Sequence, residues 1–187
     1  IKACAKRLNS INNGEKMSQK LIMLFAVLMM ILSLNAQRNR KSGENAVFYP
    51  VSRIVDGDTF WIDDGSEKGI KIRLTGIDAP ETRNSRNRVK SAFGEESTRY
   101  LTGLIAGKRV RLEYDIDTLD RYGRTLAYVY LEDGTFVNAS MVRNGYASVM
   151  TTPPNVRYAE TFVELARKAR KRKLGLWNET TLSGNEF

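Results

Sequence analysis

The feature that most constrains the fold is a series of short β-forming segments, separated by turn signals, that begins at Phe48. The segments cover residues 51–55, 59–62, 70–74, 109–114 and 126–131. Asp56-Gly57 and Asp64-Gly65 follow the first two segments, and an Asp-Gly step between β-formers is a strong hairpin signal. In the third segment apolar and basic residues alternate with a period of two, which also favours a strand.

Three helical segments accompany these strands. Residues 90–105 lie between the third and fourth strands, and residues 137–144 are closed by Gly145. Residues 158–173 carry apolar side chains on one face. Five strands with a helix between the third and the fourth are typical of a small closed barrel of the OB type. The predicted fold class is therefore α+β, a five-stranded OB-fold β-barrel with about three α-helices.

The residues before Phe48 differ in character. An apolar run of 14 residues, 21–34, follows Met17 and Lys20, and Ala36 offers a small residue for cleavage. A short basic region, an apolar core of this length and a small residue after it are typical of a secretory signal peptide. The run is short for a bilayer span, which needs about 20 residues. We expect a secreted or periplasmic protein that meets a membrane only if this segment stays uncleaved.

These features divide the chain into five expected parts. Because the sequence begins with Ile1 rather than Met, residues 1–16 are expected to lie upstream of the initiator. The other parts are a signal peptide (17–36), a linker (37–47), the folded domain (48–178) and a C-terminal tail (179–187). The first part of the chain is thus not expected to join the fold.

The composition narrows the possible chemistry. The absence of histidine excludes Ser-His-Asp and Cys-His catalysis, imidazole zinc sites and nucleases with a histidine base. A single cysteine, Cys4, excludes an internal disulfide framework and a cysteine-based zinc site. The formal net charge of +9 favours a polyanionic partner, either nucleic acid or an anionic membrane surface. Any chemistry must rest on carboxylates, Arg, Lys, Tyr and hydroxyls, with a hard metal as an option.

Two aspartates, Asp58 and Asp78, lie at predicted strand edges that a barrel could bring together. Two carboxylates, a backbone carbonyl and waters would make a hard-oxygen site for Ca²⁺ or Mg²⁺. With only two charged ligands its affinity would be low, which suits a compartment rich in calcium. Taken alone, Asp56-Gly57-Asp58 is better explained as ordinary turn chemistry.

Arg73 and Arg124 are candidate phosphate ligands. Phosphodiester hydrolysis develops negative charge on the phosphoryl oxygens, and guanidinium groups neutralise such charge at any working pH. Arg73 stands between two apolar residues, so it is expected to face away from the barrel core unless the pleat turns it toward a site. Glu81 could accept a proton from an attacking water. Each of these residues alone also fits an ordinary surface charge.

Taken together, three ordered motifs resemble the thermonuclease (staphylococcal nuclease-like) family. They are Asp56-Gly57-Asp58-Thr59, then Arg73-Leu74-Thr75-Gly76-Ile77-Asp78-Ala79-Pro80-Glu81, then Asp120-Arg121-Tyr122-Gly123-Arg124-Thr125-Leu126-Ala127-Tyr128. The resemblance continues to Leu174-Gly175-Leu176-Trp177 and covers about residues 48–178. It implies an OB-fold, Ca²⁺-dependent phosphodiesterase that acts on DNA and RNA with little base preference.

The resemblance implies a metal site and a residue that acts on water. Asp58 and Asp78 correspond to the carboxylate ligands of the metal. Ala79 stands where the family often has threonine, and the ligand there is the backbone carbonyl, which alanine retains. Glu81 corresponds to the glutamate that acts on the nucleophilic water. In this hypothesis the calcium ion polarises a non-bridging phosphate oxygen.

The resemblance also implies a phosphate clamp. Arg73 and Arg124 correspond to the two arginines that hold the reacting phosphate, and Arg121 and Tyr122 to the contacts with a neighbouring phosphate. If the regiochemistry of the family holds, the P–O5′ bond breaks and 3′-phosphate products result.

The family pattern is broken at residues 150–155, where two nucleotide-binding tyrosines are expected and no aromatic residue stands. Stacking is worth ~1–3 kcal/mol per base, so this departure bears on nucleotide affinity rather than on hydrolysis. Tyr158, at the start of the third helix, is a candidate replacement. The basic loop at 83–90 fits equally well a surface that binds the phosphate backbone and ordinary surface charge. The basic run at 167–173 is better explained as the solvated face of a helix.

Two other classes of protein stay open. A non-catalytic OB-fold nucleic-acid-binding module would keep the barrel and the charge but usually not the carboxylates and arginines. A cationic protein of the membrane surface would explain the charge but not the ordered acidic and basic motifs. We expect a monomer without a stable protein partner, whose partners are its DNA and RNA substrates.

Overall fold

The computed structural model describes residues 46–81 and 92–178, together with residues 23, 25–27, 29 and 30. The chain divides into two compact units, residues 1–46 and 47–187. Residues 23, 25–27, 29 and 30 of the first unit are helical and exposed, and they lie within the predicted apolar run. Among the described residues, no helix has both the length and the apolar character needed to cross a bilayer. The predicted initiator, the cleavage point, residues 37–45 of the linker, the basic loop and the C-terminal tail lie outside the described residues.

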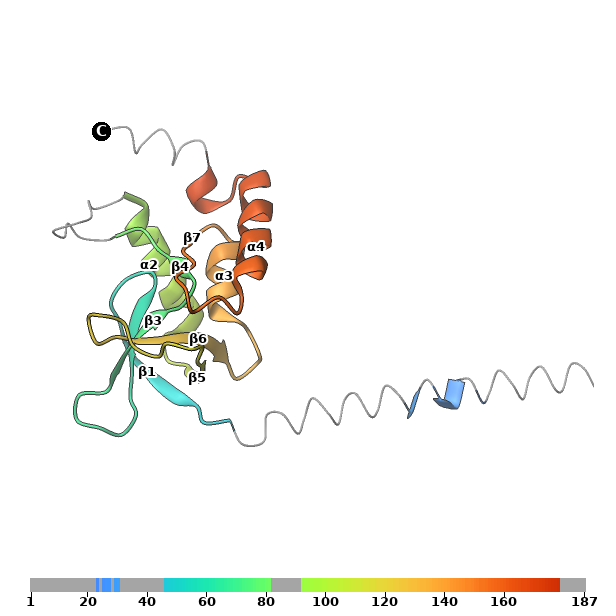
Figure 1. The fold of residues 1–187 in the computed structure, drawn as a ribbon, viewed down its shortest axis with the longest axis horizontal. Helices are drawn as coiled ribbons and strands as arrows, with labels where there is room; N and C mark the ends of the chain where they lie inside the picture. Colours follow the sequence, from blue (N-terminus) through green and yellow to red (C-terminus); the bar gives the residue numbers. More distant parts are fainter. Residues whose placement is uncertain (1–22, 24, 28, 31–45, 82–91, 179–187) are drawn as a thin grey trace, which may run out of the picture. The chain divides into compact units, whose positions relative to one another are not determined.

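The second unit is built on a closed five-stranded barrel (Figure 1). Its strands are β1 (Tyr49–Ile54), β2 (Thr59–Ile62), β3 (Ile70–Leu74), β5 (Arg109–Glu113) and β6 (Thr125–Leu131). They follow one another around the barrel in the order β1-β2-β3-β6-β5, and β1 pairs with β5 to close it. Only the β3–β6 pair is parallel among the described barrel strands. This confirms the predicted α+β fold with an OB-type barrel.

The barrel forms because alternate residues of its strands are apolar. Phe60 and Ile62 of β2 and Ile72 and Leu74 of β3 are fully or almost fully buried in the core. The residue between the first pair, Trp61, is half-buried on the other face of the sheet. Burying such side chains contributes about 1.5–3 kcal/mol each. The strands are therefore fixed in register by their apolar faces.

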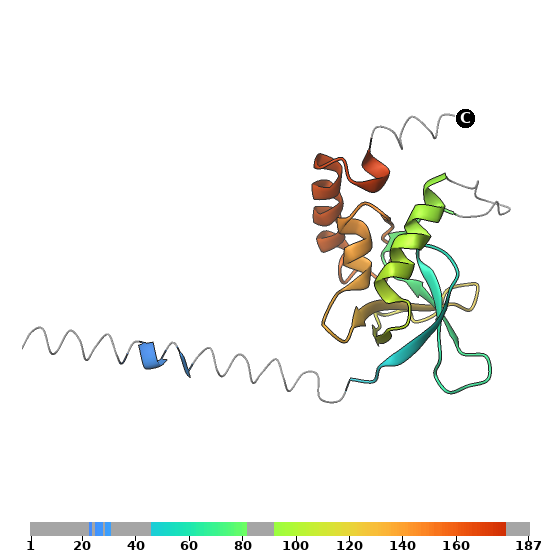
Figure 2. The ribbon, with the colours of Figure 1, turned by 180° about the vertical axis from the view of Figure 1, so that it is seen from behind.

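Three α-helices and a short 3₁₀ helix are described around the barrel: α2 (Ala92–Ile105), α3 (Val137–Arg143), α4 (Ala159–Lys171) and η1 (Gly175–Trp177). The helices α3 and α4 pack against each other, and α2 contacts α3 (Figure 1, Figure 2). Gly145, with φ of +77°, follows α3 as predicted. A pair of two-residue strands, β4 (Ile77–Asp78) and β7 (Ser148–Val149), was not predicted, because two residues carry no period.

Asn138 of α3 ties the helices to the part of the barrel that carries the site. Its side chain is fully buried, and its Oδ1 accepts a hydrogen bond of 2.9 Å from the Val129 N–H of β6. Its Nδ2 donates to the carbonyl of Thr75, at 2.9 Å, and to that of Ala127. Thr75 begins the turn that leads from β3 to β4. Asn138 therefore holds this turn, and with it Asp78, against the barrel.

Candidate active site

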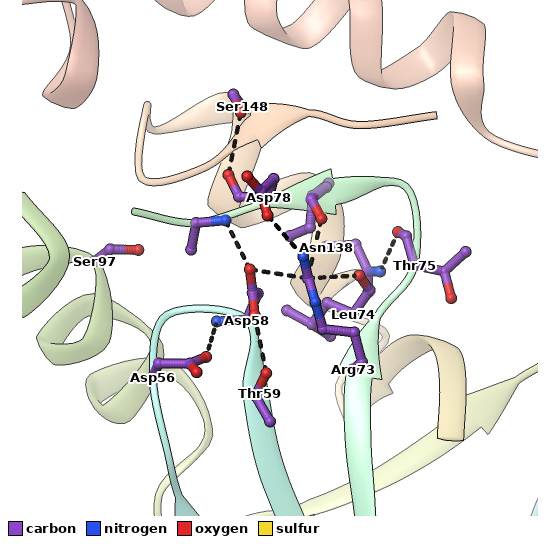
Figure 3. A network of polar contacts seen from close by, with 12 residues as sticks. Asp56, Asp58, Thr59, Arg73, Leu74, Thr75, Asp78, Ser97, Asn138 and Ser148 are labelled. Atoms are coloured by element: carbon purple, nitrogen blue, oxygen red, sulfur yellow. Dashed lines mark hydrogen bonds and ion pairs between the residues drawn. The ribbon is translucent and has the colours of Figure 1, made fainter. Parts of the chain in front are cut away.

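Arg73 is the centre of a buried ionic cluster (Figure 3). Its Nη1 lies 2.9 Å from Asp58 Oδ2, and its Nη2 lies 2.8 Å from Asp78 Oδ1. The guanidinium also donates to the carbonyls of Leu74 and Ile77, at 3.2 and 3.0 Å. The Arg73 and Asp58 side chains are only 6% and 7% exposed, and Asp78 is 23% exposed. The barrel thus brings together two carboxylates that are 20 residues apart in the sequence.

The Asp58 carboxylate is fixed by the chain on both sides of it. The Thr59 hydroxyl donates to its Oδ1 at 3.0 Å, and the backbone N–H of Ala79 donates to its Oδ2 at 2.7 Å. The Asp58 N–H in turn donates to Asp56 Oδ1, which is a local turn contact. Gly57 is required in this turn because a Cβ there would meet Ser97 Oγ of α2 at 2.2 Å. The turn before β2 is therefore fixed to the residue that follows β4.

The electrostatics of Asp58 fit a cation site. Burial raises the pKa of Asp58 to about 7, with Asp56 adding to the rise and the Arg73 guanidinium opposing it. A buried carboxylate of this kind is stabilised by a cation placed beside it. In residues 46–81 and 92–178, no three Asp, Glu, His or Cys side chains are grouped so that they could hold a metal ion by themselves. A hard cation would have to complete its coordination with the Ala79 carbonyl and water, as calcium commonly does.

A second group of charged residues lies in the turn before β6. Asp120 accepts hydrogen bonds from the backbone N–H groups of Tyr122 and Arg124, at 2.8 and 2.9 Å, and from Arg124 Nε at 2.6 Å. Burial alone would raise the pKa of Asp120, but these bonds and the Arg124 charge lower it. Arg121 donates to the hydroxyl of Tyr122, and the guanidiniums of Arg121 and Arg124 lie 4.8 and 5.4 Å from its ring. This turn presents two arginines and an exposed tyrosine.

Both groups open into one cleft of about 1180 Å³. Its charged and aromatic lining includes Asp56, Asp58, Arg73, Glu81, Arg121, Tyr122 and Arg124. Asp78 and Ala79 are not part of this lining but are bonded to it through Arg73 and Asp58. The structure therefore brings the eight residues predicted for catalysis, metal binding and phosphate binding to one cleft or directly behind it.

Several details differ from the sequence-based expectation. Arg73 does face away from the core residues Ile72 and Leu74, yet it is buried because β4 and the turn before β2 cover it. Tyr158 does not replace the missing tyrosines: it is not in the lining of the cleft, and its hydroxyl donates to Glu113 Oε1 at 2.7 Å. Its ring instead packs edge-on against Tyr128, 4.6 Å between centroids.

Two residues of the site belong to the motifs named above, but the sequence predicts no role for either. Asp120 orients Arg124, and Asp56 both bonds the Asp58 N–H and lines the cleft. Each has a local signal that was available: an aspartate two or four residues before the group it binds, inside a turn. Aspartates of this kind are common in turns, and only the structure shows which of these turns lie beside the cleft.

A five-stranded OB-type barrel with acidic and guanidinium groups in one cleft defines the class of this protein. Residues 71–179 match the family described as staphylococcal nuclease homologue. A thermonuclease of Staphylococcus intermedius is 35% identical over 162 residues, which cover 84% of this chain and 94% of the relative. An uncharacterized endonuclease of Escherichia coli O157:H7 is 41% identical over 132 residues, covering 69% of this chain and 76% of the relative. The chain belongs to the staphylococcal nuclease family.

Proposed function

We propose that this member of the family, a hydrolytic nuclease of nucleic acids, is a Ca²⁺-dependent endonuclease that cleaves DNA and RNA with little sequence preference. The observation that carries the proposal is the position of Arg73, between Asp58 and Asp78 and in the lining of the cleft that Glu81 and Arg124 also line. A cleft with cationic groups on both sides and a carboxylate beside them suits a phosphodiester and an attacking water.

The metal would be held by Asp58, Asp78 and the carbonyl of Ala79. Both carboxylates form ion pairs with the Arg73 guanidinium, and the N–H of Ala79 donates a hydrogen bond to Asp58. When bound, the ion would supply Lewis-acid polarisation of a phosphate oxygen. The remaining chemistry belongs to side chains of this chain.

Glu81 would orient a water and take its proton as the water attacks phosphorus. Arg73 and Arg124 would stabilise the negative charge that grows on the phosphoryl oxygens. The P–O5′ bond would break to leave a 3′-phosphate, and the departing O5′ would take a proton from solvent water and leave as a 5′-hydroxyl. Arg121 and Tyr122 would hold an adjacent phosphate at the exposed side of the cleft. Because a contact with phosphate carries no information about the bases, it suits a substrate of variable sequence.

The test is digestion of single-stranded DNA and RNA by the purified protein with Ca²⁺, with Mg²⁺ and with excess chelator. We expect cleavage with calcium, less with magnesium because it demands stricter octahedral geometry, and none with chelator. Products should gain a free 3′-hydroxyl only after phosphatase treatment.

Glu81→Gln should lower kcat by about 10²–10⁴-fold, as loss of a general base does. Glu132→Gln is the matched control, because Glu132 is exposed and paired only with Arg109 in the described contacts, outside the cleft lining. Binding of DNA without cleavage in any metal would contradict the proposal and favour the non-catalytic binding module.

We also propose that the protein is exported, on the strength of the apolar run at 21–34. Expression in a bacterial host followed by N-terminal sequencing of the extracytoplasmic protein tests this. A start at Gln37 is expected, and retention of the intact chain in the cytoplasm would contradict it.

A further inference from the structure

Three neighbouring strands present a cation, an indole and a cation side by side on the outer face of the barrel. Trp61 of β2 is the register partner of Arg53 in β1 and of Lys71 in β3. Side chains opposite one another on antiparallel strands lie on the same face, ≈ 4.5–5.5 Å apart at Cβ. Because Phe60 and Ile62 point into the core, Arg53, Trp61 and Lys71 share the outer face. We name these three residues the outer row.

The indole lies between the two positive charges. Arg53 Cζ is 5.3 Å from the ring centroid of Trp61, and Lys71 Nζ is 6.0 Å from it. The buried indole N–H has no hydrogen-bond acceptor among the described residues. A hydrogen bond therefore does not explain why a tryptophan stands here, whereas its large aromatic face, close to cations, is a surface on which nucleic-acid bases stack.

The outer row is continuous with the candidate active site. Trp61 and Lys71 line the main cleft together with Asp58 and Arg73. They also line a second pocket of about 360 Å³ with Arg53 and Glu81. A strand that passes the catalytic groups can thus reach the indole without leaving the recessed surface.

We propose that the outer row is a nucleotide subsite of the nuclease: one base of a single-stranded substrate stacks on Trp61, and Arg53 and Lys71 bind the phosphates on either side of it. The entering base displaces a cation from the ring, and the released charge meets the backbone. This inference rests on the proposed function. It also gives the cleft a stacking group, although residues 150–155 contribute no aromatic side chain.

The first test uses Trp61 as its own reporter. The chain has two tryptophans, so Trp177→Phe leaves Trp61 as the only one. In the full chain carrying Trp177→Phe and Glu81→Gln, with calcium, a single-stranded DNA of about ten nucleotides should quench the fluorescence saturably. Trp61→Leu should raise Kd for this DNA roughly 5- to 150-fold, as loss of one stacked base does, and Trp61→Phe should raise it far less.

The length of the ligand separates a subsite from a structural role. A dinucleotide that fills only the catalytic groups should bind the Trp61→Leu variant nearly as well as the parent. The inference is wrong if both ligands lose affinity equally. It is also wrong if Trp61→Leu and Trp61→Phe are equally destabilised in urea unfolding and bind the longer DNA equally weakly, because Trp61 would then serve only to pack the strands.

The second test removes the charges. Arg53→Gln and Lys71→Gln should each reduce the slope of log Kd against log salt concentration by about 0.7, the value for one contact with a single strand. Arg111→Gln is the matched control, since Arg111 also lies over an aromatic ring, 4.4 Å from the Tyr130 centroid, but lines neither pocket. An equal change in Arg111→Gln would overturn the phosphate contacts.

The two proposals fail in different ways. If the parent cleaves DNA but Trp61 shows no quenching, the outer row is not a subsite and the nuclease function stands. If Trp61 is quenched but the parent cleaves nothing with any metal, the hydrolytic proposal fails and the binding surface stands.

Discussion

The two sides of the cleft hold their arginines by different means. Arg73 lies on a barrel strand, almost fully buried, and donates to two carboxylates and two carbonyls. Arg124 lies in a turn, 26% exposed, and depends on one residue, Asp120, four positions before it. The first arginine is positioned by the fold as a whole and the second by a local turn. Their difference predicts which substitutions damage stability and which damage only activity.

The largest expected effect separates the two arginines by stability. Arg73→Gln leaves Asp58 buried without its partner, so it should lower the free energy of unfolding by about 3–5 kcal/mol. Arg124→Gln breaks a pair that solvent reaches, and the expected loss is below ~1 kcal/mol. Urea unfolding with excess chelator, which keeps metal binding out of the comparison, measures both. Equal losses would show that the burial of Arg73 does not set its contribution.

Two glycines extend the comparison to the backbone. In Gly57→Ala the new Cβ meets Ser97 Oγ at 2.2 Å and the Ala79 Cβ at 2.7 Å, and overpacking of this kind costs about 1–3 kcal/mol. Because Ala79 also bonds Asp58, we expect cleavage to fall as well. Gly123→Ala has open space around it but a φ of +76°, so its cost of about 1 kcal/mol is conformational.

Thermal unfolding and cleavage rates of the two alanine variants check this pair. Gly57→Ala should lose activity even at a temperature where it is fully folded, since the clash acts on the site. If Gly57→Ala folds and keeps the parental activity, the new methyl group displaces Ser97 of α2 without moving the turn that carries Asp58.

A feature of the fold or the site can be predicted from the sequence when the residues that form it lie close together in the chain. The five barrel strands follow from alternation and turn residues, and their observed bounds lie within two residues of the predicted ones. The joining of Asp58, Arg73 and Asp78 does not follow from any local pattern, because it depends on how the barrel closes. The predicted strand edges allow Asp58 and Asp78 to meet, but only the resemblance of three ordered motifs adds Arg73 to the same site.

The residues that escaped prediction are those whose role depends on side-chain direction. Asp120 and Asp56 are turn residues by type, and nothing in their spacing distinguishes them from Asp133, which accepts the N–H of Thr135 in an exposed turn. The sequence pattern places Trp61 in a strand and no more, because its neighbours on the outer face are set by pairing with β1 and β3. Cross-strand register is thus the information that the linear pattern lacked.

Asp120 should affect cleavage because it orients Arg124 on the more exposed side of the cleft. Asp120→Ala removes the acceptor of the Arg124 guanidinium and of two backbone N–H groups, so kcat/KM should fall about tenfold or more through loss of orientation. Asp120→Asn keeps an oxygen for the backbone N–H groups and should lose less. Asp133→Ala, with the same local turn contact outside the cleft lining, is the control in steady-state cleavage assays. If Asp133→Ala slows cleavage as much, the effect is not one of orienting Arg124.

The smallest expected effect is the pH dependence of the stability that Asp120 contributes to the turn carrying Arg124. Hydrogen bonds from Arg124 and Tyr122 outweigh burial and lower the pKa of Asp120 below its usual 3.8. Because the folded pKa is depressed, this carboxylate stabilises the protein fully above the unfolded pKa, and the contribution is lost as the pH falls through the folded pKa. The pair is partly exposed, so the contribution should stay below ~1 kcal/mol.

A comparison of the parent with Asp120→Asn isolates this contribution, since the other carboxylates titrate alike in both proteins. The gap between their urea midpoints should be largest near pH 6. It should begin to narrow near pH 4, where the unfolded carboxylate takes up its proton, and close as the pH falls through the lower pKa of the folded carboxylate. A gap that is constant with pH would mean that the charge of Asp120 does no more for the turn than its shape. In that case the turn that carries Arg124 would be held by the geometry of its hydrogen bonds, in contrast to the buried ion pairs of Arg73.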